Sequence, residues 1–338
     1  MEFVLVSSSA LARSMAHGDI ADMKRQYGIA LLVIGIAFGL CGCGNEAGDG
    51  RFKFALISDL HVRLPGNPDD QDHDNQGNID NLEATVGTIN SRFGDSEFVM
   101  VTGDLVGCLF SENPGDYLIG QPNPAEKCKD IMDGLDMPWY AALGNHDYHS
   151  GYDVADGAMT PANNFRNVEA IWTKVTGFQP YYSFVFKGVR FVILDSSIGP
   201  FSSTKCTFSS QETLCIGSFG EEQMSWFEAE LQNPEPCLVF FHHPLITDDS
   251  DVMWSFAGDG FKVAEEDRFY EVVAANSSVI KGIFVGHGHV WANDTICGTI
   301  PVYETGSIGD YLGEADNICI VTVDANDGVF DVKQRAAR

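Results

Sequence analysis

The chain has 338 residues, 44% of them hydrophobic, which is enough apolar sequence for one large core or two small ones. Its 48 acidic and 20 basic residues give a formal net charge of −28. Such an acidic surface favours solubility and repels nucleic acid and anionic membranes, so we expect no nucleic-acid partner. A site for any anionic ligand in this chain must carry its own positive charge, for which bound metal is the obvious source.

Residues 1–43 are predicted to form an N-terminal extension and a lipoprotein-type signal segment. A basic start, Met23-Lys24-Arg25, precedes an apolar run over residues 27–40 that is too short to span a bilayer. The run ends in Leu40-Cys41-Gly42-Cys43, which resembles a bacterial lipobox and would leave a lipidated Cys43 at the mature N-terminus. Residues 44–50 are predicted as a linker and 51–338 as the folded domain. We therefore expect an exported protein with a lipid anchor in the membrane; a single-pass anchor is the alternative.

Seven cysteines follow Cys43, and export would permit disulfides among them. None has the C-x-x-C spacing of a structural zinc site. Seven is an odd number, so at least one thiol stays free, and we expect this to be Cys237, inside the apolar run 237–241. The candidate pairs are Cys206 with Cys215, Cys108 with Cys128, and Cys297 with Cys319.

Beyond residue 50, short apolar runs alternate with stretches typical of helices. Strands are predicted over residues 52–57, 98–102, 139–143, 182–186, 190–194, 238–241, 280–285, 302–304, 318–323 and 329–332. Helices are predicted over residues 81–92, 126–134, 163–175, 221–231 and 263–276. The polar segments 66–80 and 111–124 are predicted as surface loops. This alternation predicts an α/β domain built in layers.

Five of the predicted strands run directly into polar residues that can bind metal. The segments are Ser58-Asp59-Leu60-His61, Gly103-Asp104, Gly144-Asn145-His146-Asp147, His242-His243 and Gly286-His287-Gly288-His289. Side chains at the carboxyl ends of neighbouring strands point into one crevice, which is where α/β sheets bind ligands. The glycines before Asp104, Asn145 and His287 would let the backbone approach closely there.

Seven of these side chains suffice for two metal ions if one carboxylate bridges them. Imidazole together with carboxylate suits iron, zinc, manganese or cobalt better than calcium, which prefers oxygen ligands throughout. Taken singly the motifs are weak: Gly-Asp is more often a turn, and His242-His243 could simply cap a strand. Taken together and in this order they predict a metal site.

The order Asp-x-His, Gly-Asp, Gly-Asn-His-Asp, His and Gly-His-x-His resembles the calcineurin-like metallophosphoesterase superfamily, over about residues 54–306. The resemblance implies a four-layer αββα sandwich whose domain, residues 51–338, carries two divalent or trivalent metal ions. One ion would be bound by Asp59, His61, Asp104 and His289. The other would be bound by Asp104, Asn145, His242 and His287, with Asp104 as the bridge and His243 behind the ligands.

The resemblance is greatest to the bacterial phosphodiesterase branch of the superfamily. Purple acid phosphatases place a metal-binding Tyr after Gly-Asp, and this chain has Leu105 there. Protein Ser/Thr phosphatases carry an Arg-Gly after this motif, which the chain lacks. The resemblance therefore implies a small phosphate-ester substrate, with a phosphodiester preferred.

The expected mechanism is hydrolysis by water that the two ions activate. His146 stands beside a predicted ligand and is expected to stabilise the transition state or to protonate the leaving oxygen. Asp147 is expected to orient His146 or to make a structural salt link. His149 is predicted either to line the cleft or to lie in a surface loop.

Two other functions remain open from the sequence. A phosphomonoesterase, such as an acid phosphatase or nucleotidase, would use the same site. A non-catalytic binding scaffold would be expected to have lost metal ligands, and here the set of seven is intact. A nuclease is disfavoured because the chain has no basic stretch. Substrate, metal identity and oligomeric state are not encoded in motifs that we can interpret.

Overall fold

The computed structural model describes residues 50–64, 75–107, 124–148, 161–197, 207–208, 213–214, 217–248, 264–309 and 317–336. All of them belong to the unit Ala47–Arg338. The predicted signal segment with Cys43, and also His149, lie outside the described residues, so the predictions made for them stay predictions. Among the described helices, none is both long and apolar enough to cross a membrane.

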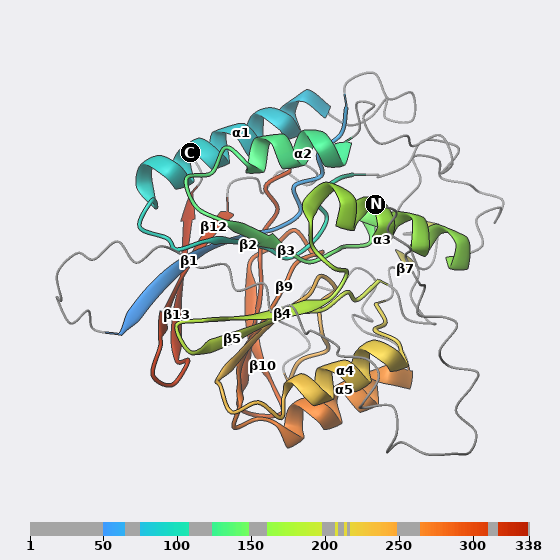
Figure 1. Ribbon diagram of the computed structural model, residues 1–338, viewed down its shortest axis with the longest axis vertical. Helices are drawn as coiled ribbons and strands as arrows, with labels where there is room; N and C mark the ends of the chain where they lie inside the picture. Colours follow the sequence, from blue (N-terminus) through green and yellow to red (C-terminus); the bar gives the residue numbers. More distant parts are fainter. Residues whose placement is uncertain are drawn as a thin grey trace, which may run out of the picture. The chain divides into compact units, whose positions relative to one another are not determined.

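Two mixed β-sheets form the centre of this unit (Figure 1). In the five-stranded sheet the strand order is β13-β12-β1-β2-β3, and β1, β2 and β3 are parallel. In the six-stranded sheet the order is β10-β11-β9-β8-β5-β4, and β5, β8, β9 and β11 are parallel. The strands are β1 Arg51–Ile57, β2 Val99–Val101, β3 Trp139–Ala141, β4 Tyr182–Phe186, β5 Val189–Ile193, β8 Cys237–Phe240, β9 Ile280–Val285, β10 Ala292–Ile296, β11 Ile300–Glu304, β12 Asn317–Asp324 and β13 Phe330–Ala336. A separate pair consists of β6 Thr207–Phe208 and β7 Thr213–Leu214.

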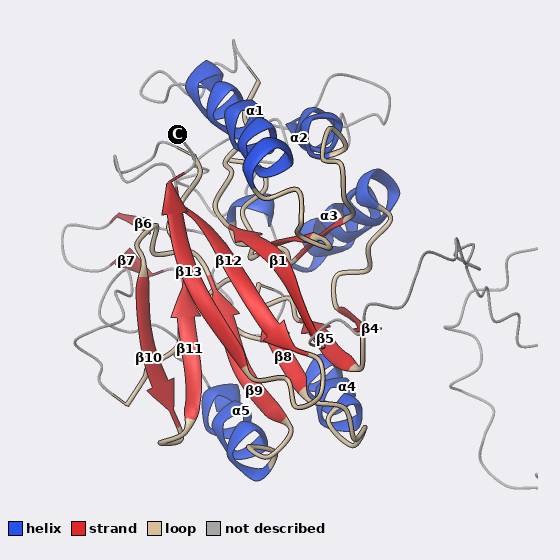
Figure 2. Ribbon diagram, turned by 90° about the vertical axis from the view of Figure 1, so that its left-hand side faces the viewer, coloured by secondary structure: helices blue, strands red, loops and turns tan. Residues whose placement is uncertain are grey.

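Helices cover the outer face of each sheet. The helices are α1 Asn75–Arg92, α2 Pro124–Met132, α3 Pro161–Thr176, α4 Glu221–Glu230 and α5 Ala264–Ala275, with a 3₁₀ turn, η4, at His146–Tyr148. Figures 1 and 2 show α1, α2 and α3 on the side of the five-stranded sheet and α4 and α5 on the side of the six-stranded sheet. The order of layers is helix, sheet, sheet, helix, so the predicted four-layer αββα fold is confirmed.

Three apolar clusters fill the three interfaces between the four layers. In β1, Ala55 and Ile57 face α1 to α3, whereas Phe54 and Leu56 face the other sheet. This alternation follows from the two-residue period of a strand, and it gives β1 two apolar faces because both are covered. Between the sheets the filling is aromatic: the ring centroid of Phe54 lies 5.1 Å from that of Phe98 and 5.9 Å from that of Phe240. The edge-to-face contact of Phe54 with Phe240 joins the two sheets, and Phe98 stacks on Phe54 beside it.

All ten predicted strands and all five predicted helices are present, whereas β6, β7 and β10 were not predicted and α1 is longer than predicted. Strand β10, Ala292–Ile296, was missed because its sequence, Ala-Asn-Asp-Thr-Ile, is polar; it is held by a tight turn at Cys297 and Gly298, both with positive φ. Helix α1 begins at Asn75, so residues 75–80 are not the surface loop that was predicted. The buried Asn78 donates from Nδ2 to the carbonyl of His61 at 3.0 Å, a tertiary contact that outweighs the weak helix propensity of this segment.

The cysteine predictions are partly wrong. Cys237 is a buried free thiol, as expected, but Cys128, Cys297 and Cys319 are free as well. Cys319 lies in β12 of the five-stranded sheet and Cys297 in the β10–β11 turn of the six-stranded sheet, so this pair is separated by the fold. Because Cys128 and Cys319 are free, the predicted Cys108–Cys128 and Cys297–Cys319 pairs are wrong; Cys108 itself lies outside the described residues. Cys206 and Cys215 lie outside the described residues, and their pairing stays a prediction.

Candidate metal centre

The loops that follow β1, β2, β3, β8 and β9 meet at one edge of the two sheets. Backbone hydrogen bonds continue beyond the strands and bind the loops to one another: the amide of Asp59 donates to Gly103 at 3.1 Å, and that of Gly286 donates to His242 at 2.9 Å. A bridge between Ser58 and Ser307 joins the two sheets at this edge. The five polar segments identified in the sequence therefore lie together.

Glycine is required where these loops touch. A Cβ atom on Gly144 would lie 2.2 Å from Asp104 Oδ1, and one on Gly286 would lie 2.1 Å from Ser58 Oγ. A Cβ on Gly103 would lie 2.4 Å from His242 Nδ1. Each distance is far below a van der Waals contact, so the close approach expected for these three glycines is confirmed.

The first cluster consists of Asp59, His61 and His289, all of them buried. His289 Nε2 lies 3.2 Å from Asp59 Oδ1 and 3.0 Å from His61 Nε2. The other carboxylate oxygen of Asp59 accepts hydrogen bonds from Ser58 Oγ at 2.5 Å and from the amide of His287 at 3.1 Å. Asp59 is thus oriented by one oxygen while the other faces the two imidazoles.

The second cluster consists of Asp104, His242 and His287, together with the amide of Asn145. His242 Nε2 lies 3.0 Å from Asp104 Oδ2 and 3.0 Å from Asn145 Oδ1. His287 Nδ1 lies 2.9 Å from Asn145 Oδ1 and 3.2 Å from His242 Nε2. Asp104 Oδ2 is also 3.8 Å from His61 Nε2, so a single carboxylate reaches both clusters.

Both clusters fit metal ions. Asp59 Oδ1 and Asp104 Oδ2 are buried oxygens that accept no hydrogen bond. In each cluster two imidazole nitrogens face each other, His61 with His289 at 3.0 Å and His242 with His287 at 3.2 Å. Carboxylate oxygens without donors, beside imidazole nitrogens that converge on the same point, form the donor set that transition metals prefer. The structure therefore brings together all seven side chains predicted as ligands; their binding of metal stays a prediction.

The charges of the centre are set by burial and by mutual attraction. Burial alone would raise the pKa of Asp104, but the imidazoles of His242, His146 and His61 hold it well below its usual range. Burial alone would likewise lower the pKa of His242, but Asp104 raises it to about 9. Burial, helped by His242, lowers the pKa of His287 to about 3. At pH 7 Asp104 is therefore ionised and His287 neutral, which are the states that ligate a cation, whereas His242 would have to give up a proton to a bound cation.

His146 lies at the border of the first cluster. Its ring centroid is 4.6 Å from that of His61, and its Nδ1 is 3.0 Å from the carbonyl oxygen of Gly107. Its backbone amide donates to Asp104 Oδ1 at 2.8 Å. The ring is half-buried, and a ligand atom of His146 lies within reach of those of His61 and Asp104. His146 therefore stands beside the predicted ligands, as the sequence suggested, and within reach of an ion shared with His61 and Asp104.

Asp147 has backbone partners. Its carboxylate accepts hydrogen bonds from the amide of Gly144 at 2.8 Å and from that of Val106 at 3.1 Å. Burial, reinforced by Asp104, raises its pKa well above the ordinary value. These contacts support a role in fixing the loops after β2 and β3, and they do not support the predicted orientation of His146 by Asp147.

A buried polar network behind the second cluster was missed in the sequence. His243, expected behind the ligands, lies with Nδ1 2.7 Å from Ser196 Oγ. The neighbouring Asp195 accepts from the hydroxyl of Tyr148, and Gln223 of α4 bonds the backbone of Asp195 at 2.8 and 2.7 Å. Burial raises the pKa of Asp195 to about 7. The signal was present, because Asp195 and Ser196 follow a predicted strand, β5, as the ligands follow theirs.

The loop after β11 also contacts the loops that carry the two clusters. Ser307 Oγ donates to the carbonyl of Asp59 at 2.8 Å, and Thr305 Oγ1 lies 3.0 Å from Thr102 Oγ1. Glu304 is fully buried, and neither of its carboxylate oxygens has a hydrogen bond. Burial, with Asp59 nearby, raises its pKa well above the ordinary value.

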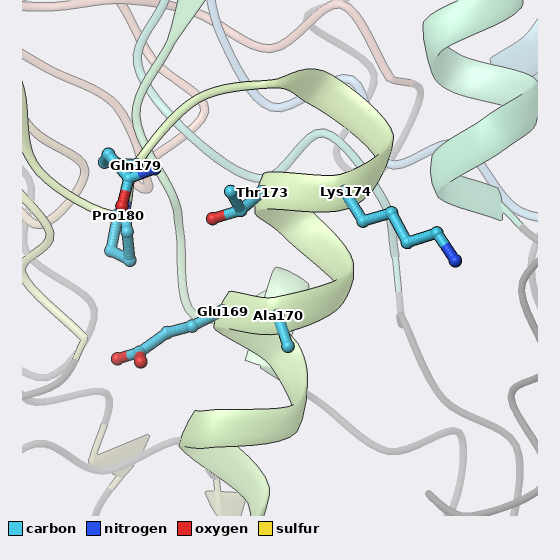
Figure 3. Close-up of a pocket in the computed structure, with 6 residues that line it drawn as sticks. All are labelled: Glu169, Ala170, Thr173, Lys174, Gln179 and Pro180. Carbon is cyan, nitrogen blue, oxygen red and sulfur yellow. The ribbon is translucent and has the colours of Figure 1, made fainter. Parts of the chain in front are cut away.

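A shallow cavity of about 470 Å³ lies on α3 and the segment before β4 (Figure 3). It is lined by Glu169, Ala170, Thr173, Lys174, Gln179 and Pro180. None of these residues belongs to either cluster. With one acidic and one basic side chain, the cavity offers no excess positive charge to a phosphate.

Comparison with known proteins agrees with this geometry. A model of the calcineurin-like phosphoesterase family matches residues 52–291, which is more than half of the chain. No curated protein matches the chain significantly.

Several solved structures share the fold. A dimetal phosphatase from Danio rerio superposes with a TM-score of 0.53 at 15% identity, covering 85% of this chain and 96% of its own. GAP50 of Plasmodium, an anchor in the inner membrane complex, has a TM-score of 0.51 at 13% identity, covering 85% of both chains. Purple acid phosphatase PPD1 from yellow lupin has a TM-score of 0.52 at 13% identity, covering 85% of this chain and 52% of its own. At these identities the likeness concerns the fold alone.

Proposed function

The chain belongs to the calcineurin-like phosphoesterase family, whose members hydrolyse phosphoric esters, and we propose that this enzyme hydrolyses a phosphodiester with two metal ions held by the two clusters. One observation carries the proposal: Asp104 Oδ2 lies 3.0 Å from His242 of the second cluster and 3.8 Å from His61 of the first. A carboxylate placed between two sets of imidazoles is the arrangement that a bridged pair of cations requires.

The residues that would hold the ions follow from the contacts. Asp59, His61, His289 and Asp104 would hold one ion, and Asp104, Asn145, His242 and His287 the other. Cations bound there supply Lewis-acid stabilisation of phosphoryl charge and lower the pKa of water. Iron, zinc, manganese and cobalt all suit this donor set.

The protein's own part in the reaction falls to His146. Its Nδ1 donates to the carbonyl of Gly107, so in the protonated ring the transferable proton would be the one on Nε2. The half-buried ring borders the first cluster, so a substrate whose phosphoryl group lies between the clusters would present its leaving oxygen to this side. His146 would then act as the general acid.

A diester is favoured over a monoester by two features of the sequence. Asp59-Leu60-His61 and the Leu105 that follows Gly103-Asp104 match the phosphodiesterase branch and depart from purple acid phosphatases. A phosphomonoesterase or nucleotidase remains the alternative on the same site. A binding scaffold is the alternative of another class, and one protein of this fold, GAP50, is described as an anchor; the intact seven-residue set favours catalysis.

The test is a parallel assay of bis-p-nitrophenyl phosphate and p-nitrophenyl phosphate with each of the four metals. We expect faster hydrolysis of the diester, about two metal ions per chain by elemental analysis, and loss of activity on chelation. A preference for the monoester would mean that the protein is a phosphomonoesterase or nucleotidase. Full activity after exhaustive EDTA treatment would refute the two-metal mechanism, and a metal-free, inactive protein would support the scaffold.

The small phosphate-ester substrate would be met outside the cytoplasm. Because of the apolar run 27–40 and Leu40-Cys41-Gly42-Cys43, we propose cleavage before Cys43, lipidation of its thiol and attachment to a membrane. Mass spectrometry of the membrane fraction should find an N-terminal peptide that begins at Cys43 and carries a lipid. An N-terminal peptide that begins at Met23 would contradict the proposal.

A further inference from the structure

The short turn that carries His146 is bonded to both sheets. It runs from Asn145 to Tyr148 and is closed by the amide of Tyr148, which donates to the carbonyl of Asn145 at 3.1 Å. In its middle, the amide of His146 donates to Asp104 Oδ1 at 2.8 Å, and the carboxylate of Asp147 accepts from two backbone amides. These partners lie in the loops after β2 and β3, so the middle of the turn is held by the five-stranded sheet.

The two ends of the turn contact the six-stranded sheet. Asn145 does so through His242 and His287, which are predicted metal ligands. Tyr148 does so without them, because its hydroxyl donates to Oδ2 of Asp195, just beyond the end of β5. The ring of Tyr148 is fully buried in the apolar cluster that the helices α1 to α3 share with the five-stranded sheet. Ring and hydroxyl therefore anchor the turn in the two sheets at once.

Asp195 is an acceptor that is itself held in place. Its Oδ1 accepts from the amide of Ser197 at 2.8 Å. Its backbone amide donates to Gln223 Oε1 at 2.8 Å, and Gln223 Nε2 donates to its carbonyl at 2.7 Å. Both Asp195 and Gln223 are buried, and Gln223 belongs to α4. The hydrogen bond from Tyr148 therefore ends on an atom whose position is set by β5 and α4.

We infer that Tyr148 is a positioning residue for the general acid: its hydrogen bond to Asp195 fixes the turn so that His146 presents Nε2 to the leaving oxygen. The inference rests on the proposed function, because it takes His146 as the general acid. Proton transfer requires hydrogen-bond geometry, and a displacement of about 1 Å can lower a rate by about 100-fold. Tyr148 is fully buried and acts through His146.

The test compares two diesters, bis-p-nitrophenyl phosphate and diphenyl phosphate, whose leaving groups differ in their need for a proton. Tyr148→Phe removes the hydroxyl and keeps the buried ring. In the full-length, metal-loaded protein this variant should lower kcat for diphenyl phosphate by about tenfold, because phenolate is the stronger base, and kcat for bis-p-nitrophenyl phosphate by less than about twofold. Metal content should stay that of the wild type. The same loss for both diesters, no loss for either, or a loss of metal would overturn the inference.

A double variant shows whether Tyr148 acts through His146. Tyr148→Phe added to His146→Ala should lower kcat no further, since the residue that it positions is already gone. A further drop of the same size as in the wild type would refute the inference. The matched control is Tyr140→Phe, the same change in a half-buried tyrosine of β3 whose ring stacks on Phe184. It should leave both rates unchanged, and a loss confined to diphenyl phosphate in this control would also contradict the inference.

Asp195→Asn is the second variant, for the case that Tyr148→Phe does not fold. The carboxylate accepts from the hydroxyl of Tyr148 with one oxygen and from the amide of Ser197 with the other, whereas an asparagine side chain has a single oxygen. The variant therefore disturbs the hydrogen bond and leaves the ring of Tyr148 in place. We expect the same selective loss for diphenyl phosphate, and equal losses for the two diesters would count against the inference.

The ring signals of His146 give a measurement that needs neither metal nor hydrolysis. In proton–nitrogen correlation spectra of the metal-free protein, the signals of His146 are assigned by their absence from His146→Ala. Tyr148→Phe should shift or broaden them, because the turn is no longer anchored to Asp195, and Tyr140→Phe should not. Signals of His146 that are unchanged in Tyr148→Phe would refute the positioning role.

The two proposals fail separately. Hydrolysis of bis-p-nitrophenyl phosphate by the wild type tests the proposed function alone. If the wild type hydrolyses this diester but Tyr148→Phe alters neither the signals of His146 nor the dependence on the leaving group, the phosphodiesterase stands and the positioning role is refuted. If the wild type hydrolyses no ester but Tyr148→Phe shifts the signals of His146, the proposed function is refuted and the placement of His146 by Tyr148 stands.

Discussion

The two clusters of the metal centre are built by different means. In the first cluster all three side chains stand on left-handed backbone: φ is 53° at Asp59, 46° at His61 and 59° at His289. Non-glycine residues avoid this region, at a cost of roughly 1–2 kcal/mol each. In the second cluster Asp104 and His287 share this conformation, with φ of 50° and 77°, whereas Asn145 and His242 are not among the residues with positive φ.

The second cluster is braced by side-chain hydrogen bonds instead. His242 Nδ1 lies 2.8 Å from the carbonyl of Thr102, and Asn145 Oδ1 contacts both imidazoles. Behind it, His243 is held by Ser196 and Tyr148 by Asp195. In the first cluster all three ligands therefore carry backbone strain, whereas the second is organised beforehand by side-chain hydrogen bonds.

The largest effect is expected at Asp104, because its carboxylate reaches both clusters. Asp104→Asn takes away the charge that both ions need, so at least one ion should be lost and activity should fall to that of the metal-free protein. Elemental analysis and the diester assay measure both. Asp136→Asn, the same change at an exposed position, should alter neither. An Asp104→Asn protein that still holds two ions would show that Asp104 does not bridge.

His146→Ala tests whether His146 is a metal ligand or the general acid. If His146 is the general acid, metal content should stay unchanged and turnover should fall by about 10²–10⁴. The loss should be greatest for alkyl esters and smallest for p-nitrophenyl esters, since p-nitrophenolate needs little protonation. Loss of metal would make His146 a ligand of the group with His61 and Asp104. An equal loss of turnover for all leaving groups would mean that His146 stabilises charge on the phosphoryl group and is not the general acid.

Stepwise chelation should remove the two metal ions one after the other. The ion at the second cluster meets ligands already held by hydrogen bonds, so less ordering accompanies its binding, and we expect its affinity to be higher by about tenfold. Titration with a chelator should therefore pass through a state with one ion per chain. Spectra of a cobalt-substituted protein, compared with those of Asn145→Ala, identify the ion that remains. Loss of both ions in a single step would remove the proposed difference.

The smallest effect concerns the network behind the second cluster. Burial raises the pKa of Asp195 from its ordinary value of 3.8 to about 7, so between these values the folded protein keeps a proton that the unfolded chain releases. Its contribution to stability is full below about pH 4 and is lost as the pH rises to about 7.

Urea denaturation of metal-free protein from pH 4 to 8 measures this contribution as the difference between wild type and Asp195→Asn. We expect the difference to decline with pH by up to about 1.4 kcal/mol per unit within the window. A difference that rises with pH would mean that Asp195 is ionised in the folded protein.

The strand ends explain why so much of the centre could be predicted. A run of apolar residues followed by Asp, Asn or His at the end of a strand is visible in the sequence, and the sheets bring those ends together whatever the loops contain. The left-handed conformation of Asp59, His61 and His289 could not be predicted from the sequence, because none of the three residues is a glycine or an asparagine. It exists only because tertiary contacts impose it.

Other features depended on partners distant in the sequence. The first turns of α1 were predicted as a loop because Asn78 finds its partner, the carbonyl of His61, only in the folded chain. Polar β10 is a strand because β11 pairs with it. The predicted Cys297–Cys319 pair was wrong because the fold places the two cysteines in different sheets.

The position of β1 in its sheet has a consequence for the order in which the molecule can fold. β1 lies between β2 and β12, and Leu56 pairs with Cys319, near the other end of the chain. His61 likewise meets His289 across 228 residues. During synthesis one edge of β1 stays unpaired until β12 has emerged, and His61 lacks its neighbour until His289 has emerged. Contacts of such long range slow folding and expose an edge that can aggregate, so this protein should depend on chaperones for as long as its last strands are missing.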